Sequence, residues 1–341
     1  MSTSPQKQII WGLGIFVFIF FSANQIYNFG DVFFNKIKVF KTASVFENSI
    51  ILEKKNVSLA FVGDIMLDRG VKSSVNKNFF GDYGELFSKV SDRLQKYDIL
   101  VGNLEGPISN GGVDGGGVYS FRFEPKVAEV LKDVGFDILS IANNHIYNWG
   151  GVAFIDTLKS ISEIKIDYIG GGFTGTEAYK EKIINLEGVT LAFLAFSEFK
   201  EGMVTKDSTF PGIAVISEEQ IKEGVLKAKM RADLVITSFH FGEEYADLPN
   251  GYQRRISELA VDSGADLVIG HHSHVVGSLE KYNNSYIIYS LGNFIFDQYF
   301  SEKTMQGGLL EVEVDSKNKK IEKVNLKKVL LNKYYQIEDI I

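Results

Sequence analysis

The residues most suited to chemistry in this sequence are its histidines, of which the 341 residues contain five. Three stand together as His271, His272 and His274, and the other two are His145 and His240. Each group follows an apolar run of strand length, at the kind of strand end where open α/β sheets bind ligands. A single histidine in such a place is most often a hydrogen-bonded core residue. Because neutral imidazole is the commonest metal ligand, the set as a whole predicts a metal site.

Further polar residues follow apolar runs in the same way, namely Asp64, Asn103 with Glu105, and Asn144 beside His145. Each segment alone is typical of a turn. The chain has no cysteine, so a metal must be held by His, Asp, Glu and Asn, a ligand set that suits Mn, Fe, Zn or Mg. We therefore expect one or two divalent ions. Two cations about 3.5–4 Å apart can bind a phosphoryl group and activate a shared water.

Composition and charge narrow the class of protein. The chain is 45% hydrophobic and 23% charged, which is ordinary for a globular protein of one large or two modest domains. The formal net charge is −7, and no basic stripe indicates a nucleic-acid partner.

The N-terminal stretch predicts a membrane segment. No charged side chain occurs between Lys7 and Asp31, and the run is long enough to cross about 30 Å of hydrocarbon as a helix. We expect residues 1–30 to be an uncleaved anchor and residues 31–56 a stalk. A cleaved signal peptide is the closer alternative and a buried core helix the remoter one. The short tail before the run predicts a single-pass cell-membrane protein with an extracytoplasmic soluble domain.

The remaining chain predicts an α/β domain over residues 57–300, with residues 301–341 completing it as C-terminal strands. Apolar runs predict strands at 57–62, 98–101, 137–142, 233–239 and 266–270, and helices are expected near 84–96, 125–134, 151–161, 218–230 and 252–263. Hairpins are expected at Glu187-Gly188 and Asn283-Asn284, and two further strands at 308–315 and 320–331. Alternating strands and helices with several hairpins predict mixed sheets.

The polar segments, taken in order, resemble the calcineurin-like metallophosphoesterase superfamily and, within it, the CapA family of poly-γ-glutamate capsule synthesis proteins. The resemblance covers residues 57–297 and rests on Val-Gly-Asp64-Ile-Met-Leu, Gly-Asn103-Leu-Glu105-Gly-Pro, Ala-Asn-Asn144-His145, His240-Phe-Gly-Glu243-Glu-Tyr, Gly-His271-His-Ser-His274 and Ser290-Leu-Gly-Asn293-Phe-Ile-Phe-Asp297. It implies a four-layer αββα sandwich of two mixed sheets, and the N-terminal anchor also fits that family.

The resemblance also implies residue roles. His145 is expected to donate to the transition state, and His271 to lie behind the ligands or to contact substrate. The implied metal ligands are Asp64, Asn144, His240, His272 and His274.

Two positions depart from the superfamily pattern. Met66 stands where the first motif has a histidine, and Asn103 stands where it has a bridging aspartate. A neutral amide bridges cations poorly, so Glu105 is expected to supply the missing charge as a ligand. The protein therefore holds one metal or a different pair.

Several neighbouring residues have two interpretations. Arg69 and Arg122 could clamp a phosphate or carboxylate, although a structurally paired arginine is the plainer interpretation. Asn293 and Asp297 are expected behind the metal ligands or in loop structure. Glycines 170–172 suggest a phosphate cradle or, more simply, a turn.

The resemblance implies a role in making or exporting an anionic surface polymer such as poly-γ-glutamate. Two classes of function stay open. One is a metal-dependent hydrolase of a phosphoester or of a polyglutamate-type amide. The other is a non-catalytic scaffold or polymer-binding subunit of a membrane synthase complex. The expected partners are the polymer or phosphoester, the membrane and other capsule synthase subunits.

Overall fold

The structure is a computed structural model that describes residues 56–341. The anchor expected over 1–30 and nearly all of the stalk expected over 31–56 lie outside the described residues. Among residues 56–341, no helix is long and apolar enough to cross a membrane.

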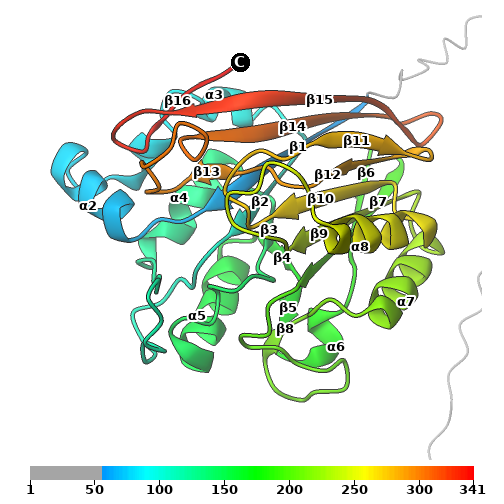
Figure 1. Cartoon of the computed structure of the whole chain (residues 1–341), viewed down its shortest axis with the longest axis horizontal. Coiled ribbons are helices and arrows are strands. Elements are labelled where there is room, and N and C mark those ends of the chain that lie inside the picture. Colours follow the sequence, from blue (N-terminus) through cyan, green and yellow to red (C-terminus); the bar gives the residue numbers. More distant parts are fainter. Residues whose placement is uncertain (1–55) are drawn as a thin grey trace, which may run out of the picture. The chain divides into compact units, whose positions relative to one another are not determined.

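Two sheets form the body of the described chain (Figure 1). The larger sheet has eight strands, in the order β16 (Ile337–Ile340), β15 (Lys320–Leu331), β14 (Gln306–Asp315), β1 (Val57–Ile65), β2 (Ile99–Leu104), β3 (Ile138–Ser140) and β4 (Asp167–Ile169), with β13 (Asn293–Ile295) off this path. The central strand β1 pairs in parallel with β2 and antiparallel with β14. The short strand β13 pairs with β1 at Asp64 and Ile65, beyond the end of β14.

The second sheet has six strands, in the order β11 (Leu279–Tyr282), β12 (Ser285–Ile288), β10 (Leu267–His271), β9 (Leu234–His240), β7 (Val189–Ser197) and β6 (Lys182–Leu186). Its middle strands are parallel and its edges are closed by hairpins. A separate two-stranded sheet pairs β5 (Gly171–Gly172) with β8 (Gly212–Ile213). The expected mixed α/β sheets are confirmed.

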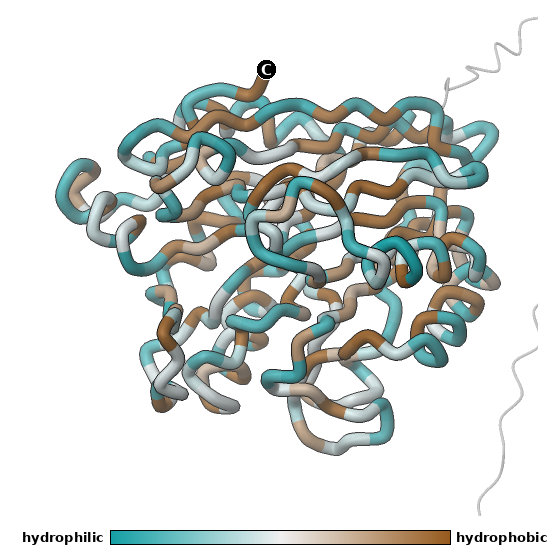
Figure 2. The backbone as a smooth tube through the Cα atoms, in the orientation of Figure 1, coloured by the Kyte–Doolittle hydropathy of each residue, from teal (hydrophilic) through white to brown (hydrophobic). Residues whose placement is uncertain are grey.

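The two sheets pack face to face around an apolar core that includes Phe61 and Val101 from one sheet and Phe193, Ile236 and Ile269 from the other. Figure 2 shows the long hydrophobic stretches along these strands. Strands buried on both faces need near-continuous apolar runs, which is why the sequence predicted them well.

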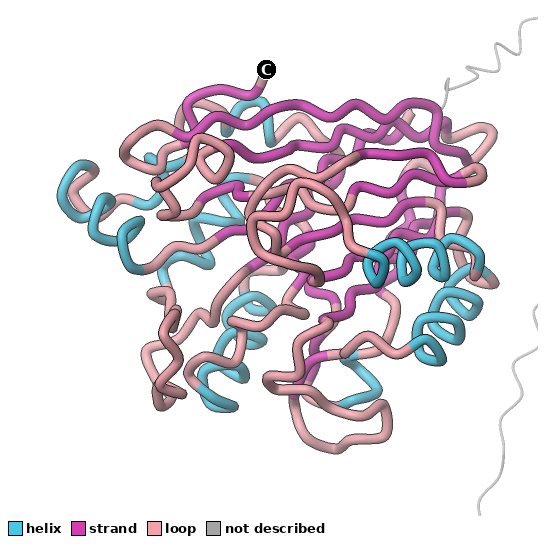
Figure 3. Tube along the Cα trace, in the orientation of Figure 1, coloured by secondary structure: helices cyan, strands magenta, loops and turns pink. Residues whose placement is uncertain are grey.

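Helices cover the outer face of each sheet (Figure 3). On the larger sheet these are α2 (Arg69–Asn78), the 3₁₀ helix η1 (Tyr83–Leu86), α3 (Ser91–Leu94), α4 (Lys126–Val134) and α5 (Gly150–Glu163). On the second sheet they are α6 (Gly175–Ala178), α7 (Glu218–Lys229) and α8 (Gly251–Asp262).

Local signals placed most elements correctly. Both hairpins are confirmed, with positive φ at Glu187, Gly188 and Asn283, as tight hairpin turns require. The continuous helix expected over 84–96 is wrong. The chain forms η1 and the single turn α3 instead, and i→i+3 bonds such as that from Val90 N to Phe87 O bend the segment between them. The sequence also missed α2, whose mean hydropathy is low.

Candidate metal centre

The polar residues that follow separate strands converge at one place. Asp64 in β1 lies beside Asn103 in β2, and His240 lies beside His271 at the ends of β9 and β10. The first pair belongs to the larger sheet and the second pair to the other. Because the sheets pack face to face, their strand ends bring the two pairs together.

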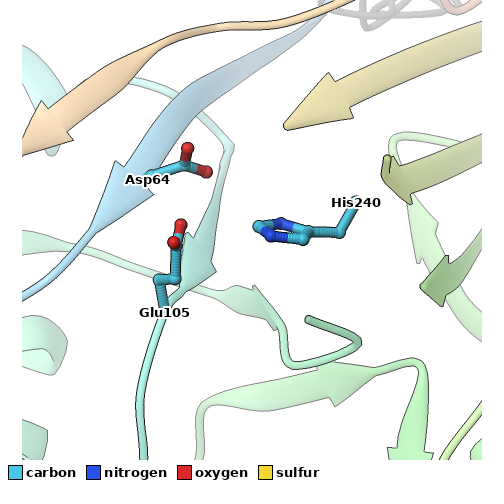
Figure 4. Close-up of side chains that lie close together, drawn as sticks. All are labelled: Asp64, Glu105 and His240. Atoms are coloured by element: carbon cyan, nitrogen blue, oxygen red, sulfur yellow. The ribbon is translucent and has the colours of Figure 1, made fainter. Parts of the chain in front are cut away.

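Asp64, Glu105 and His240 form the centre of this group. One ligand atom from each lies within 4.8 Å of the other two, and all three side chains are buried. Figure 4 shows the two carboxylates close together and the His240 imidazole directed toward them. Two carboxylates and an imidazole suit a divalent cation.

His274 and His271 extend the centre. His274 Nδ1 lies 3.3 Å from Asp64 Oδ2, and its Nε2 lies 3.8 Å from Glu105 Oε1. His271 Nδ1 lies 3.3 Å from Asp64 Oδ1. Asp64 therefore contacts two imidazoles at once, as expected for a carboxylate in a metal site.

Buried polar atoms without partners test whether the site fits a cation. Among the described residues, Glu105 Oε1, His271 Nδ1 and His272 Nδ1 are buried without a hydrogen-bond partner. Such atoms are costly to bury, and a bound cation would satisfy electron-pair donors placed in this way. The donor set therefore fits a divalent metal.

Burial shifts the proton affinities of the centre. Burial and then the Asp64 charge raise the pKa of Glu105 well above its usual range. Burial alone would raise the pKa of Asp64, but its contacts with His271 and His274 outweigh that effect and hold it well below its usual range. Burial lowers the pKa of His240 and brings that of His272 to about 3. The imidazoles of His240 and His272 are thus neutral, which is the form that binds metals.

The orientation of the Asn103 amide is fixed by Asn143. Asn143 Oδ1 accepts the backbone N–H groups of His145 and Ile146, so Asn143 Nδ2 donates to Asn103 Oδ1 at 3.1 Å. The NH₂ group of Asn103 consequently faces the centre and donates to Asp64 Oδ1 at 2.8 Å. An amide NH₂ has no lone pair for a cation, so Asn103 in this orientation crosslinks the centre without bridging metals.

Met66 does not replace the missing superfamily histidine. Its side chain is fully buried in the helix-side core, and its sulfur accepts the backbone N–H of Asp68.

Asn293 lies behind His274, in the supporting place expected for it. Asn293 Nδ2 donates to the Thr304 carbonyl at 2.9 Å, so Asn293 Oδ1 accepts from His274 Nδ1 at 3.0 Å. His274 Nδ1 therefore carries a proton, and Nε2 is the ring atom that faces Glu105.

His272 and His274 both have positive φ, at 94° and 59°, which concentrates backbone strain at this site.

Asn144 and His272 lie on the His240 side of the centre. Asn144 Oδ1 is 2.8 Å from His240 Nε2, and the His272 and His240 rings are 4.9 Å apart. Both residues adjoin the centre, and their roles as ligands stay predictions.

His145 is held by Asn148, a residue that the sequence reasoning missed. Asn148 Oδ1 accepts the backbone N–H of Phe121 and lies 2.9 Å from His145 Nδ1, so Nδ1 carries the proton. His145 Nε2 then has a free lone pair, 3.8 Å from Glu105 Oε1. Burial lowers the pKa of His145 to about 4. The three-residue spacing from His145 is the only sequence signal for Asn148.

The two arginines have different places. Arg69 lines a cavity of about 290 Å³ together with His145 and His274. Arg122 lies with its guanidinium carbon 3.6 Å from the centre of the Trp149 ring and donates to the carbonyls of Asn110 and Gly111. Arg122 is thus held by structural contacts, as the plainer interpretation expected, and Arg69 is paired as well, with Asp297.

Glycines 170–172 do not form a cradle at the centre. Gly171 and Gly172 pair with β8, and a Cβ on Gly170 would lie 2.6 Å from the Ala142 Cβ. Close packing and a turn account for all three glycines.

Comparisons with known proteins agree with this geometry. Residues 58–298 match the family described as bacterial capsule synthesis protein PGA_cap. The capsule biosynthesis protein CapA of Bacillus anthracis is 35% identical over 257 residues, which cover 72% of this chain and 61% of that protein. The PGA biosynthesis protein CapA of Bacillus subtilis (strain 168) is 34% identical over 247 residues, which cover 71% and 64%. The chain thus spans less than two thirds of the length of either relative.

Solved structures share the fold at low sequence identity. A phosphatase from Mycoplasma pneumoniae aligns with a TM-score of 0.50 and 15% identity, covering 81% of this chain and 94% of that one. A candidate 5'-nucleotidase from Staphylococcus aureus aligns with a TM-score of 0.54 and 13% identity, covering 84% and 56%. The fold is therefore metallophosphoesterase-like.

Proposed function

Because this chain belongs to the family of bacterial capsule synthesis proteins described as PGA_cap, we propose that it acts as a metal-dependent hydrolase in the synthesis or export of an anionic polymer of the poly-γ-glutamate type. The observation that carries the hydrolase part is the buried group of Asp64, Glu105 and His240 where the two sheets' strand ends meet. The bond cleaved is a phosphoester or a γ-glutamyl amide.

The centre is proposed to hold one divalent cation. Asp64, Glu105 and His240 would be its ligands, with His274 Nε2 directed to the same place. The NH₂ group of Asn103 donates to Asp64 Oδ1, so this side chain would offer no oxygen to a second cation. When bound, the metal supplies Lewis-acid polarisation of the scissile group. Mn, Fe, Zn or Mg all suit these ligands.

His145 is proposed to act at Nε2. Since Asn148 keeps the ring proton on Nδ1, the neutral ring accepts a proton at Nε2. As water attacks phosphorus or the carbonyl carbon, Nε2 takes one water proton. It gives that proton to the leaving oxygen or nitrogen as the old bond breaks. The proton donation that was expected of His145 from the sequence is this second step, the transfer to the leaving atom.

We also propose that the protein is anchored in the cell membrane. The uncharged run over residues 8–30 supports a single-pass anchor in the cell membrane, with the folded domain outside the cytoplasm. A polymer-exporting complex at the membrane would bring the domain next to its substrate and to other synthase subunits.

A second candidate function is a scaffold that binds polymer without cleaving it. The orientation of Asn103 favours it, because the NH₂ group removes the bridging oxygen that a two-metal phosphoesterase uses.

Elemental analysis of the purified full chain, followed by turnover of a chromogenic phosphodiester and of a γ-glutamyl oligomer, separates these functions. We expect bound metal and metal-dependent turnover. The His145→Ala variant should keep its metal and lose about 10²-fold or more in kcat, the scale for one lost proton-transfer group.

Two outcomes would count against the mechanism. Loss of metal in step with activity in His145→Ala would make His145 a ligand. A metal-loaded wild type that turns over neither substrate would favour the scaffold.

A further inference from the structure

A cavity of about 290 Å³ opens beside the metal centre and shares His145 and His274 with it. A group bound in this cavity would therefore lie against the proposed proton-transfer residue. The volume is at the lower end for ligand sites, so the cavity suits one small unit of a substrate rather than a large molecule.

Arg69 is the one arginine or lysine among the described residues that line this cavity. Its Nε donates to Asp297 Oδ2 at 3.1 Å, and its Nη2 pairs with Asp297 Oδ1. Asp297 also accepts the backbone N–H of Gly70 at 2.9 Å, which fixes the carboxylate at the start of α2. The guanidinium is thus held from one side, in a geometry that Lys would not reproduce.

Aromatic rings hold the guanidinium from other sides. Its central carbon lies 4.8 Å from the Phe121 ring centre, 5.4 Å from that of Tyr119 and 5.9 Å from that of Phe296. Arg69 itself has φ of 47°, an uncommon conformation for a non-glycine residue. The ion pair with Asp297 and these ring contacts hold the guanidinium in one position.

One edge of the guanidinium stays available. Among the described residues, Arg69 Nη1 has no hydrogen-bond partner, and the side chain is 30% exposed toward solvent. An anion in the cavity can therefore receive a charge-assisted hydrogen bond from Nη1.

The neighbouring charges select the kind of anion. Asp297 already balances the Arg69 charge, and Glu244 also lines the cavity. A doubly charged phosphate would meet two carboxylates, whereas a singly charged carboxylate meets less repulsion. The rings of Phe296, Tyr299 and Phe300 offer apolar surface for methylene groups next to that carboxylate.

We infer that Arg69 binds a substrate carboxylate carried on a short aliphatic stem, so that the cavity recognises one acidic unit of the polymer next to the bond to be cleaved. This inference rests on the proposed function for the identity of the polymer, since poly-γ-glutamate carries one free carboxylate on each unit. Arg69 is then a specificity-determining residue.

The test measures binding by calorimetry on the metal-loaded full chain, with a γ-glutamate oligomer and with the same oligomer amidated at every α-carboxylate. Wild type should bind the acidic oligomer about tenfold or more tightly than the amidated one. Arg69→Gln should lose about that factor for the acidic oligomer and change little for the amidated one. Arg122→Gln, which removes a guanidinium outside the described cavity lining, should bind both as wild type does.

Equal binding of the two oligomers by wild type would overturn the inference, even if Arg69→Gln failed to fold. So would an Arg69→Gln variant that binds the acidic oligomer like wild type. The inference would also be overturned if inorganic phosphate displaced the oligomer from wild type at a concentration far below that of the oligomer, and if Arg69→Gln abolished this displacement.

The two proposals fail in different ways. Arg69-dependent selectivity without turnover would sink the hydrolase and leave the inference standing. If wild type and Arg69→Gln turned over the acidic oligomer equally, the hydrolase would stand and the inference about Arg69 would fail.

Discussion

Two asparagines set what the metal centre can hold, because a neighbour fixes each amide. Asn143 turns Asn103 so that its NH₂ group faces the carboxylates. The Thr304 carbonyl turns Asn293 so that its oxygen faces His274. The first amide offers no bridging oxygen to the centre, and the second directs His274 Nε2, the atom of a proposed ligand, toward it.

Restoring an acid at position 103 should restore the second metal position. In Asn103→Asp, one carboxylate oxygen can still accept from Asn143 while the other faces Asp64 and Glu105. We expect bound metal to rise from about one to about two ions per chain, because the new oxygen can bridge cations. Elemental analysis after dialysis measures this, with the exposed Asn185→Asp as control. An unchanged metal content would mean that something other than the amide limits the site.

Removing the acceptor behind His274 should weaken metal binding. Asn293→Ala frees His274 to rotate and to change tautomer, and we expect the affinity to fall about 10- to 100-fold, the usual effect of losing such a partner. Asn293→Asp keeps an acceptor oxygen and should retain most of the affinity. Competition with a chromogenic chelator gives both values. Equal affinities for the alanine variant and wild type would refute the assigned role.

The candidate ligands lie at strand ends, and glycines let those ends approach other backbone closely. A Cβ on Gly63 would lie 1.9 Å from the Gly292 carbonyl oxygen, and one on Gly270 would lie 2.0 Å from that of Tyr289. Gly63 precedes Asp64 and Gly270 precedes His271. These glycines therefore have a packing role that places the adjacent site residue.

Replacing a glycine whose Cβ would meet backbone should destabilise the protein, whereas replacing a glycine with open space around it should not. Gly63→Ala is expected to lower the free energy of unfolding by about 1–3 kcal/mol, because backbone must move to admit the methyl group. Gly251→Ala, at the first residue of α8 with no atom within 4 Å of its Cβ, should raise it by about 0.4–1 kcal/mol. Urea unfolding compares the two. Similar effects in both would contradict the close approach at Gly63.

The described residues, 56–341, belong to one compact unit. Its C-terminal strands β14, β15 and β16 extend the sheet of β1, and β14 pairs directly with the strand that carries Asp64. Truncation before β14 would remove the antiparallel partner of β1.

The N-terminal run predicts how the whole protein partitions. We expect the full-length chain to stay in the membrane fraction after a high-salt wash, because an apolar helix of this length is stable in hydrocarbon. Fractionation and immunoblotting measure it. An N-terminally trimmed protein released into the medium would indicate a cleaved signal peptide instead.

The sequence by itself determined the types of the candidate ligand residues, their order and their position after strands. Apolar runs predict strands wherever both faces are buried, and hairpin dipeptides need only local backbone chemistry. The order of the polar segments along the chain carries the family resemblance, and that resemblance led to six candidate ligands, namely Asp64, Glu105, Asn144, His240, His272 and His274. The helix expected over 84–96 failed because an apolar stripe can also be buried by successive tight turns.

Only the tertiary structure decided which atom of each residue faces the centre. Partners from other elements decide the orientation of the Asn103 amide and the tautomers of His145 and His274. They also decide the different places of Arg69 and Arg122. Arg69 and Asp297 are 228 positions apart, so no local pattern could pair them. Hydrogen-bond directions between distant segments exist only once the two sheets have packed, and they determine what the site can bind.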